Sequence, residues 1–472
     1  MTIVGYEEQD DVVYINYNSK NELTETIPAR QLLATNPILL EIYNYQNDVT
    51  LETRVEKRIN KVEYMPRRMQ MMIIDYFEVN HSGVGMQLIE NMLSTGKRPP
   101  SALLIALINT MLQSKDGFKS RETQRNHWSQ CKQAYTLLMD VLTLFGPEMF
   151  NPVWNEFAYF KLSCSQSMDD ESGQYELLNT KELSAYSDIW NYVDKVLHQP
   201  SHHLEARCRA LVLDFFVNVL QTDLKERLGD DRQVARSLFF ATLTNASLLA
   251  CTKFDKYLDI LLKGYPNENE HLCQLAGDLL NMMITISCFD TISSFDGLVS
   301  QLYSRFQPMD PEACSQLMQA IKYPTFLIAL LDKAVADTDV SRIESHYKKF
   351  RNKKHVPLRL EKVLFYVLKT KPNTISPEAL YRHALIVSKY CMCVLSTASI
   401  VHKRPTLREQ VTNTALEEDQ LILLIENHHQ ALDEWEAWME HCLAQFKTID
   451  LKLVEKIRWS VKLTRLTMVE YL

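Results

Sequence analysis

Glycine is scarce in this chain. There are 11 glycines among 472 residues, whereas glycine averages about 7% of protein sequences. Few positions can adopt a positive φ at low cost, so we expect few tight β-hairpins and few glycine-rich phosphate loops. The one close pair, in Gly83-Val84-Gly85, completes neither a P-loop nor a dinucleotide-binding fingerprint. This scarcity favours an all-α fold and argues against a nucleotide-dependent enzyme.

Segments typical of secreted or membrane proteins are also missing from the sequence. No run of 18 apolar residues and no signal-peptide pattern occurs. The ten cysteines are scattered without a paired framework, which is typical of a reducing compartment. The formal net charge of −8 argues against global attraction to nucleic acid. We therefore expect an intracellular protein without a membrane partner.

Catalytic and metal-binding motifs are not recognisable either. Cys391-Met392-Cys393 lies in an apolar helical pattern, where buried core cysteines are the expected interpretation. The adjacent pairs His202-His203 and His428-His429 diverge by about 100° on a helix, so neither pair forms a ligand set by itself. We therefore expect no catalytic residues, no metal ligands and no cofactor, and the sequence predicts a protein that is not an enzyme.

What the chain does contain is a long series of amphipathic helical patterns. Proline and asparagine mark most of the gaps between them, and no fixed repeat length is present. An irregular, solenoid-like stack of helices is therefore predicted, preceded by a short extended N-terminal segment. The predicted helices include 122–145, 149–163, 202–228, 231–251, 269–288, 377–397 and a long one near 406–447.

The domain organisation is predicted from one internal loop. Residues 164–180 include a serine-rich acidic stretch that interrupts the helical patterns. We expect this loop to separate an N-terminal helical block (25–163) from a C-terminal helical block (181–472). Residues 1–24 form the extended acidic and apolar segment.

The extended segment contains a candidate binding motif. Its apolar residues are preceded by acidic residues, a pattern that suits strand addition to an exposed sheet edge with a basic rim. This is the physical pattern of a SUMO-interacting motif. A packed N-terminal strand fits the same residues, so both interpretations remain open. The candidate SUMO-binding residues are Val12, Val13, Tyr14 and Ile15.

A basic cluster is the candidate nucleic-acid site. Lysines and arginines gather where a predicted helix ends, and such residues also suit the helix macrodipole on a solvated surface. Contact with a phosphate backbone is the alternative. The candidate residues are Arg342, Lys348, Lys349, Arg351, Lys353 and Lys354.

One serine in the acidic loop is a candidate phosphorylation site. Ser167 precedes Asp169, Asp170 and Glu171, and acidic residues after a serine suit an acidophilic kinase. A simple linker explains the same composition.

Several short strings, taken in order, resemble a known family. They are Arg67-Arg68-Met69, Pro99-Pro100, the 134–139 string ending in Met139, Val153-Trp154, the 209–213 string with Asp223, Cys273-Gln274-Leu275, and the 358–368 helix. Their order is similar to that in the non-SMC-element-five-like helical domain of the SUMO-interacting-motif-containing protein and SMC five/six complex localization factor family. The resemblance covers most of residues 30–400, and the last 70 residues match least.

The resemblance implies a non-enzymatic adaptor in the nucleus. Members of this family pair with a second helical protein, the element-six-like localization factor, and recruit the SMC five/six complex to specific sites. These sites include SUMO-rich bodies and damaged or extrachromosomal DNA, so DNA would be contacted indirectly. The alternative function is a helical module that binds nucleic acid directly through residues 342–359.

Overall fold

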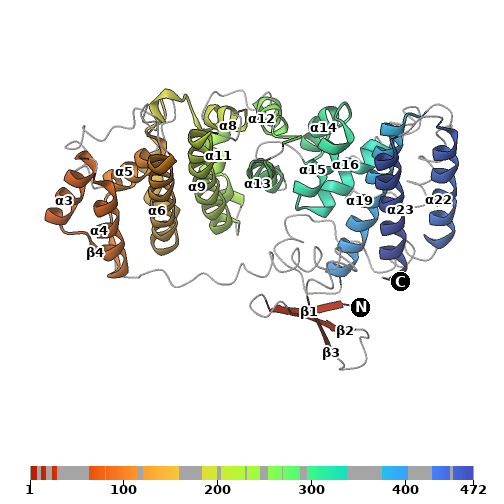
Figure 1. Cartoon of the computed structure of the whole chain (residues 1–472), viewed down its shortest axis with the longest axis horizontal. Coiled ribbons are helices and arrows are strands. Elements are labelled where there is room, and N and C mark those ends of the chain that lie inside the picture. Colours follow the sequence, from red (N-terminus) through yellow and green to blue (C-terminus); the bar gives the residue numbers. More distant parts are fainter. Residues whose placement is uncertain are drawn as a thin grey trace. The chain divides into compact units, whose positions relative to one another are not determined.

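The computed structural model (Figure 1) describes the following residues: 2–7, 12–16, 24–28, 63–79, 81–113, 121–158, 183–198, 203–228, 231–244, 253–267, 269–287, 295–336, 375–401, 428–446 and 450–470. Helices make up most of them, which confirms the all-α fold class. The chain divides into two compact units, one formed by Arg54–Ser294 and the other by Phe295–Leu472 together with Met1–Thr53.

The predicted division at 164–180 is wrong. Helices on the two sides of that loop belong to one unit, because α6 (Arg121–Phe145) packs on α9 (Leu204–Arg227). The division falls between Ser294 and Phe295 instead. Amphipathic patterns show which faces are apolar but not which helix covers them, so a polar loop was mistaken for a linker between domains.

The Arg54–Ser294 unit is a series of helices in which sequence neighbours pack on one another (Figure 1). Its central helices, α5, α6 and α9, are in mutual contact. Strand β4 lies directly before α3 in the sequence, and strand β5 follows α4. The two strands form a parallel pair. The elements are β4 (Glu63–Tyr64), α3 (Arg67–Glu78), α4 (Ser82–Ser94), β5 (Lys97–Arg98), α5 (Ser101–Leu112), α6, the 3-10 helix η2 (Pro147–Phe150), α7 (Asn151–Trp154), the 3-10 helix η5 (Leu183–Ala185), α8 (Ile189–Leu197), α9, α10 (Asp231–Val234), α11 (Leu238–Thr244), α12 (Lys253–Leu262) and α13 (Glu270–Ser287).

Glycine has a packing role where α3 meets α4. A Cβ atom at Gly85 would lie 3.0 Å from the Phe77 ring, so the missing side chain lets the two helices approach closely. Gly83 and Gly85 thus lie inside α4 and not in a phosphate loop.

Two of the predicted helices are shorter than expected. The 149–163 pattern forms only η2 and α7 within the described residues. The 231–251 pattern is broken between α10 and α11, where the Ser237 hydroxyl accepts a hydrogen bond from Phe240 N (3.2 Å) and the Asp223 carboxylate accepts one from Leu238 N (2.6 Å). These side chains satisfy the free N–H groups of α11, so a new helix begins there.

The Phe295–Leu472 unit is built around α19. This helix packs on α15, α16, α22 and α23. Arg382 on α19 donates hydrogen bonds to the carbonyl oxygens of Phe306 (2.7 Å), the last residue of α14, and of Met309 (3.1 Å), which follows that helix. The helices are α14 (Phe295–Phe306), α15 (Pro311–Ala320), α16 (Pro324–Ala336), α19 (Pro377–Val401), α22 (His428–Gln445) and α23 (Leu451–Glu470). Of the predicted 406–447 helix, residues 428–446 lie within the described part of the structure, and α22 covers 428–445 of them.

The N-terminal segment forms a three-stranded antiparallel sheet. Its strands are β1 (Thr2–Glu7), β2 (Val12–Asn16) and β3 (Thr24–Pro28), and β2 is central. Ile15 faces Ile3 on β1 and Glu25 on β3. The prediction of an extended segment is correct for β2, but its two partner strands were not predicted, and the extended region reaches Pro28 instead of residue 24.

We predict that the Phe295–Leu472 unit loses stability in mild acid because of His383. Burial and the neighbouring Arg382 lower the pKa of His383 to about 4, and its ring lies 6.4 Å from that of Trp438. The unfolded chain takes up this proton near pH 6.5, before the folded chain does. Stability therefore falls as the pH drops from about 6.5 to 4, by up to about 3 kcal/mol.

The measurement is the melting temperature as a function of pH for the wild type and His383→Phe, followed by circular dichroism. The phenyl ring keeps the contact with Trp438 and does not titrate, so the difference between the two curves isolates the imidazole. Parallel curves from pH 7 to 4 would contradict the prediction.

Candidate functional site

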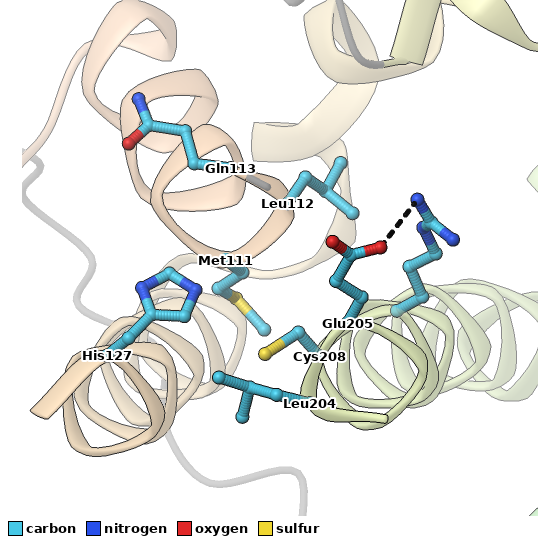
Figure 2. A pocket seen from close by; sticks show the side chains of 8 residues that line it. Met111, Leu112, Gln113, His127, Leu204, Glu205 and Cys208 are labelled. Carbon is cyan, nitrogen blue, oxygen red and sulfur yellow. Dashed lines mark ion pairs between the residues drawn. The ribbon is translucent and has the colours of Figure 1, made fainter. Parts of the chain in front are cut away.

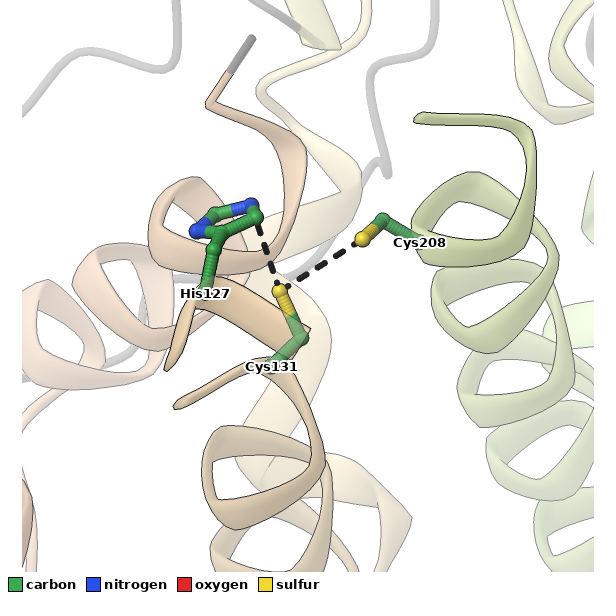
Figure 3. A group of neighbouring side chains, drawn as sticks. All are labelled: His127, Cys131 and Cys208. Atoms are coloured by element: carbon green, nitrogen blue, oxygen red, sulfur yellow. Dashed lines mark hydrogen bonds between the residues drawn. The ribbon is translucent and has the colours of Figure 1, made fainter. Parts of the chain in front are cut away.

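Three side chains that can bind a metal or carry redox chemistry meet between α6 and α9. His127 and Cys131 are one helical turn apart on α6, so both face the same way, and Cys208 approaches from α9 (Figure 3). Cys131 Sγ lies 3.4 Å from His127 Nε2 and 3.6 Å from Cys208 Sγ. All three potential ligand atoms lie within 4.8 Å of one another.

The cluster is buried in the core of the Arg54–Ser294 unit. The exposed fractions are 7% for His127, 0% for Cys131 and 3% for Cys208. Cys131 Sγ is also 3.9 Å from the carbonyl oxygens of Thr110 and Met111 at the end of α5. Polar groups at this depth must find partners, because an unpartnered buried polar group destabilises the fold.

The environment separates the acidities of the two thiols. The hydrogen bond between the sulfur atoms lowers the pKa of Cys208 to about 6, and His127 and Arg207 act in the same direction against the effect of burial. The same hydrogen bond, together with burial, raises the pKa of Cys131 above its usual range. The pair therefore favours one thiolate that accepts a hydrogen bond from the remaining thiol.

A small cavity adjoins the cluster (Figure 2). Its volume of about 10 Å³ is roughly the space that one water molecule needs. His127 and Cys208 line it together with Met111 at the end of α5, and the Glu205 carboxylate at its rim pairs with Arg209 at 3.8 Å. The cavity has no room for an organic substrate. A cysteine nucleophile activated by histidine, which this pairing could otherwise suggest, is therefore not supported by the geometry.

Sequence reasoning missed this cluster. The patterns considered in the sequence were adjacent histidines and a Cys-x-Cys string. The observed cluster instead combines a His-x₃-Cys spacing on one helix with a cysteine 77 residues further on. The His-x₃-Cys spacing was visible in the sequence and fits one helix face. No sequence pattern connects Cys208 with His127 and Cys131, because the position of Cys208 depends on how α9 packs on α6.

The histidines and cysteines that the sequence analysis did consider lie elsewhere. Cys391 is buried on α19, as predicted for a core residue. His203 is an exposed residue directly before α9. His428 and His429 begin α22, and their side chains, like His202 and the side chain of Cys393, lie outside the described part of the structure.

The candidate SUMO-binding residues lie in β2. Both edges of this strand are paired, Val13 with Tyr6 and Ile27, and Tyr14 with Gly5 and Thr26. A partner that adds a strand needs a free edge, so it could pair with β2 only after β1 or β3 has released it. The structure thus shows β2 as a strand paired on both sides, and SUMO binding by these residues remains a prediction.

The other predicted sites lie outside the described residues. They are the phosphorylation candidate Ser167 and the nucleic-acid candidates Arg342, Lys348, Lys349, Arg351, Lys353 and Lys354. Both sites remain predictions.

A second feature of the Arg54–Ser294 unit is an apolar surface on α3, which we call the α3 surface and define as Met71, Met72 and Val79. These side chains are 45%, 36% and 59% exposed, whereas Ile73 and Ile74 on the same helix are buried. Val84 at the start of α4 is 43% exposed and Tyr64 on β4 is 58% exposed. Apolar side chains that are exposed together on a surface are typical of interaction sites.

Neither a model of a protein family nor a curated protein sequence matches the chain. Within the described residues, no helix combines the length and the apolar character that crossing a membrane requires.

Proposed function

We propose that this protein is a non-enzymatic scaffold that binds a second protein through the α3 surface. The observation that carries the proposal is that α3 is apolar on two sides. Ile73 and Ile74 are buried in the fold, whereas Met72 and Val79 expose 36% and 59% of their surface. A helix with a single packing role needs only one apolar stripe.

The spacing on α3 suits a helical partner. Met72, the half-buried Tyr76 and Val79 follow one another at intervals of four and three residues, so they form a stripe along one side of the helix. Methionine side chains are flexible and polarisable, and they are common on surfaces that bind partner helices. A helix of the partner that lies along this stripe would bury it.

The resemblance noted from the sequence supplies the identity of the partner that we propose. We propose a nuclear adaptor that pairs with the element-six-like localization factor and recruits the SMC five/six complex to SUMO-rich bodies or to damaged or extrachromosomal DNA. A helical interaction surface supports this adaptor function. The assignment to the family depends on the order of the sequence motifs alone.

The test is affinity purification of the tagged chain from nuclear extract with quantitative mass spectrometry. We expect stoichiometric recovery of a second helical protein and of SMC five/six subunits from the wild type. The double variant Met72→Asp, Val79→Asp should reduce this recovery about tenfold or more, because a disrupted hot spot costs about 2 kcal/mol and 1.4 kcal/mol is tenfold in affinity.

Leu451→Asp is the matched control. Leu451 is 77% exposed at the start of α23 in the other unit, so the variant places one aspartate at an apolar surface residue that is not on α3. Recovery should stay at the wild-type level. Equal recovery with the α3 double variant would disprove the α3 surface as the interface, and a wild-type chain that returns alone would disprove the adaptor function.

A further inference from the structure

Two of the three distances within the His127, Cys131 and Cys208 cluster match those of a metal site, and all three lie within 4.8 Å. Zinc binds thiolate sulfur at about 2.3 Å and imidazole nitrogen at about 2.0–2.1 Å. In a tetrahedral site these bond lengths place two sulfur ligands about 3.8 Å apart, and a sulfur and a nitrogen about 3.6 Å apart. The structure has 3.6 Å between the sulfur atoms and 3.4 Å between Cys131 Sγ and His127 Nε2.

The cluster also provides a place for a fourth ligand. The cavity that adjoins it is lined by His127 and Cys208 and has the volume of about one water molecule. Zinc sites with three protein ligands complete their coordination with water. Cys131, which does not line the cavity, lies at the buried end of the cluster.

The chemistry of the three residues favours a borderline-soft metal ion. Two thiolates and an imidazole select zinc over magnesium or calcium, which prefer oxygen ligands. Within the described residues, this is the one group of three such side chains close enough to share an ion. The buried Cys314, in contrast, has backbone carbonyl oxygens of Phe306 and Met309 near its sulfur, at 3.7 and 3.8 Å.

We propose that His127, Cys131 and Cys208 bind one Zn²⁺ ion, with a water molecule in the adjacent cavity as the fourth ligand. Both sulfur atoms bind the ion as thiolates, so binding releases whatever protons the two thiols still carry, and the neutral imidazole coordinates through a ring nitrogen. The ion joins α6 to α9, which are also held together by side-chain packing and by the hydrogen bond from the Tyr135 hydroxyl to the Asp214 carboxylate. Its role is to stabilise the Arg54–Ser294 unit, a role separate from the partner binding proposed above.

The test is titration of the purified, reduced full-length chain with Co²⁺, which replaces zinc and is visible by absorption. We expect a thiolate-to-cobalt charge-transfer band, intense visible bands of a tetrahedral site, loss of these bands on addition of Zn²⁺, and a higher melting temperature with bound metal. Cys131→Ser and Cys208→Ser should lose the charge-transfer band. His127→Gln should keep a weaker and shifted spectrum.

Cys314→Ser is the matched control, since it removes an equally buried thiol outside the cluster and should bind cobalt as the wild type does. A folded wild-type chain without the charge-transfer band would overturn the proposal, as would retention of the band in both cluster variants. An intact mass lower by two hydrogens, with Cys131 and Cys208 linked, would assign the pair to a disulfide instead.

A second measurement decides the case if the cluster variants do not fold. Prolonged cysteine alkylation of the wild-type chain reaches buried thiols through local opening of the fold. Read by mass spectrometry with and without Zn²⁺, it should show that zinc protects Cys131 and Cys208. The half-buried Cys273 should react equally in both conditions. Protection of any other cysteine pair, or of none, would overturn the proposal.

Discussion

Replacing Trp154 by alanine should destabilise the Arg54–Ser294 unit by about 3–5 kcal/mol. Trp154 is 1% exposed and lies in an aromatic cluster that joins α7 to α9, with its ring 5.1 Å from that of Phe216 and 6.3 Å from that of Phe157. Alanine leaves a cavity that rigid helices on both sides cannot fill. Urea denaturation of the full chain, followed by circular dichroism, measures the loss.

Trp459→Ala is the control for this prediction. Trp459 on α23 is 65% exposed, so the same substitution there removes little buried area and should change the free energy of unfolding by no more than about 0.5 kcal/mol. A Trp154→Ala variant with a midpoint close to that of Trp459→Ala would show that the aromatic cluster contributes little to holding α7 against α9.

Replacing Asp223 by alanine should cost about 3 kcal/mol or more. Its carboxylate is 1% exposed, accepts a hydrogen bond from Leu238 N at 2.6 Å and pairs with Arg227 Nε at 2.9 Å. Burial raises the pKa of Asp223 while these two partners oppose the shift. Alanine leaves a buried N–H at the start of α11 without its acceptor and removes one partner of the Arg227 guanidinium.

Two further variants define the cause of that loss. Asp223→Asn keeps an oxygen that can accept the hydrogen bond from Leu238 N, so it should lose less stability than alanine. Asp75→Ala, on the exposed side of α3, should stay within about 0.5 kcal/mol of the wild type. Thermal or urea unfolding that ranks Asp223→Asn as low as Asp223→Ala would contradict the role of the hydrogen bond to α11.

The helices were predictable because their apolar residues repeat with the helical period. The patterns at 122–145, 202–228, 269–288 and 377–397 correspond closely to α6, α9, α13 and α19. The break between α10 and α11 was predictable only in part. Ser237 is a local capping residue, whereas Asp223 reaches Leu238 from α9, 15 residues earlier. Local periodicity records burial along one helix, whereas a cap from another helix depends on tertiary packing.

The candidate sites were less predictable than the fold. Two residues of the three-residue cluster, His127 and Cys131, were visible as a His-x₃-Cys spacing, but Cys208 is brought to them only by the packing of α9 on α6. The exposed apolar stripe on α3 could not be predicted either. Met72 and Val79 resemble core residues in sequence, and only the burial of Ile73 and Ile74 shows which stripe α3 keeps for the fold.

The segment 159–182 lies between α6 and α9 in the sequence, and these two helices pack on each other. Their packing, and not the covalent link through 159–182, keeps the two sides of the segment together. Tyr135 on α6 donates a hydrogen bond to Asp214 on α9 (2.7 Å), and Phe150 in η2 meets Phe215 on α9 edge to face at 5.0 Å. A protease cut within 159–182 would therefore leave a nicked but associated pair of fragments. Separately expressed halves divided there have the complementary surfaces that a split-protein reporter requires.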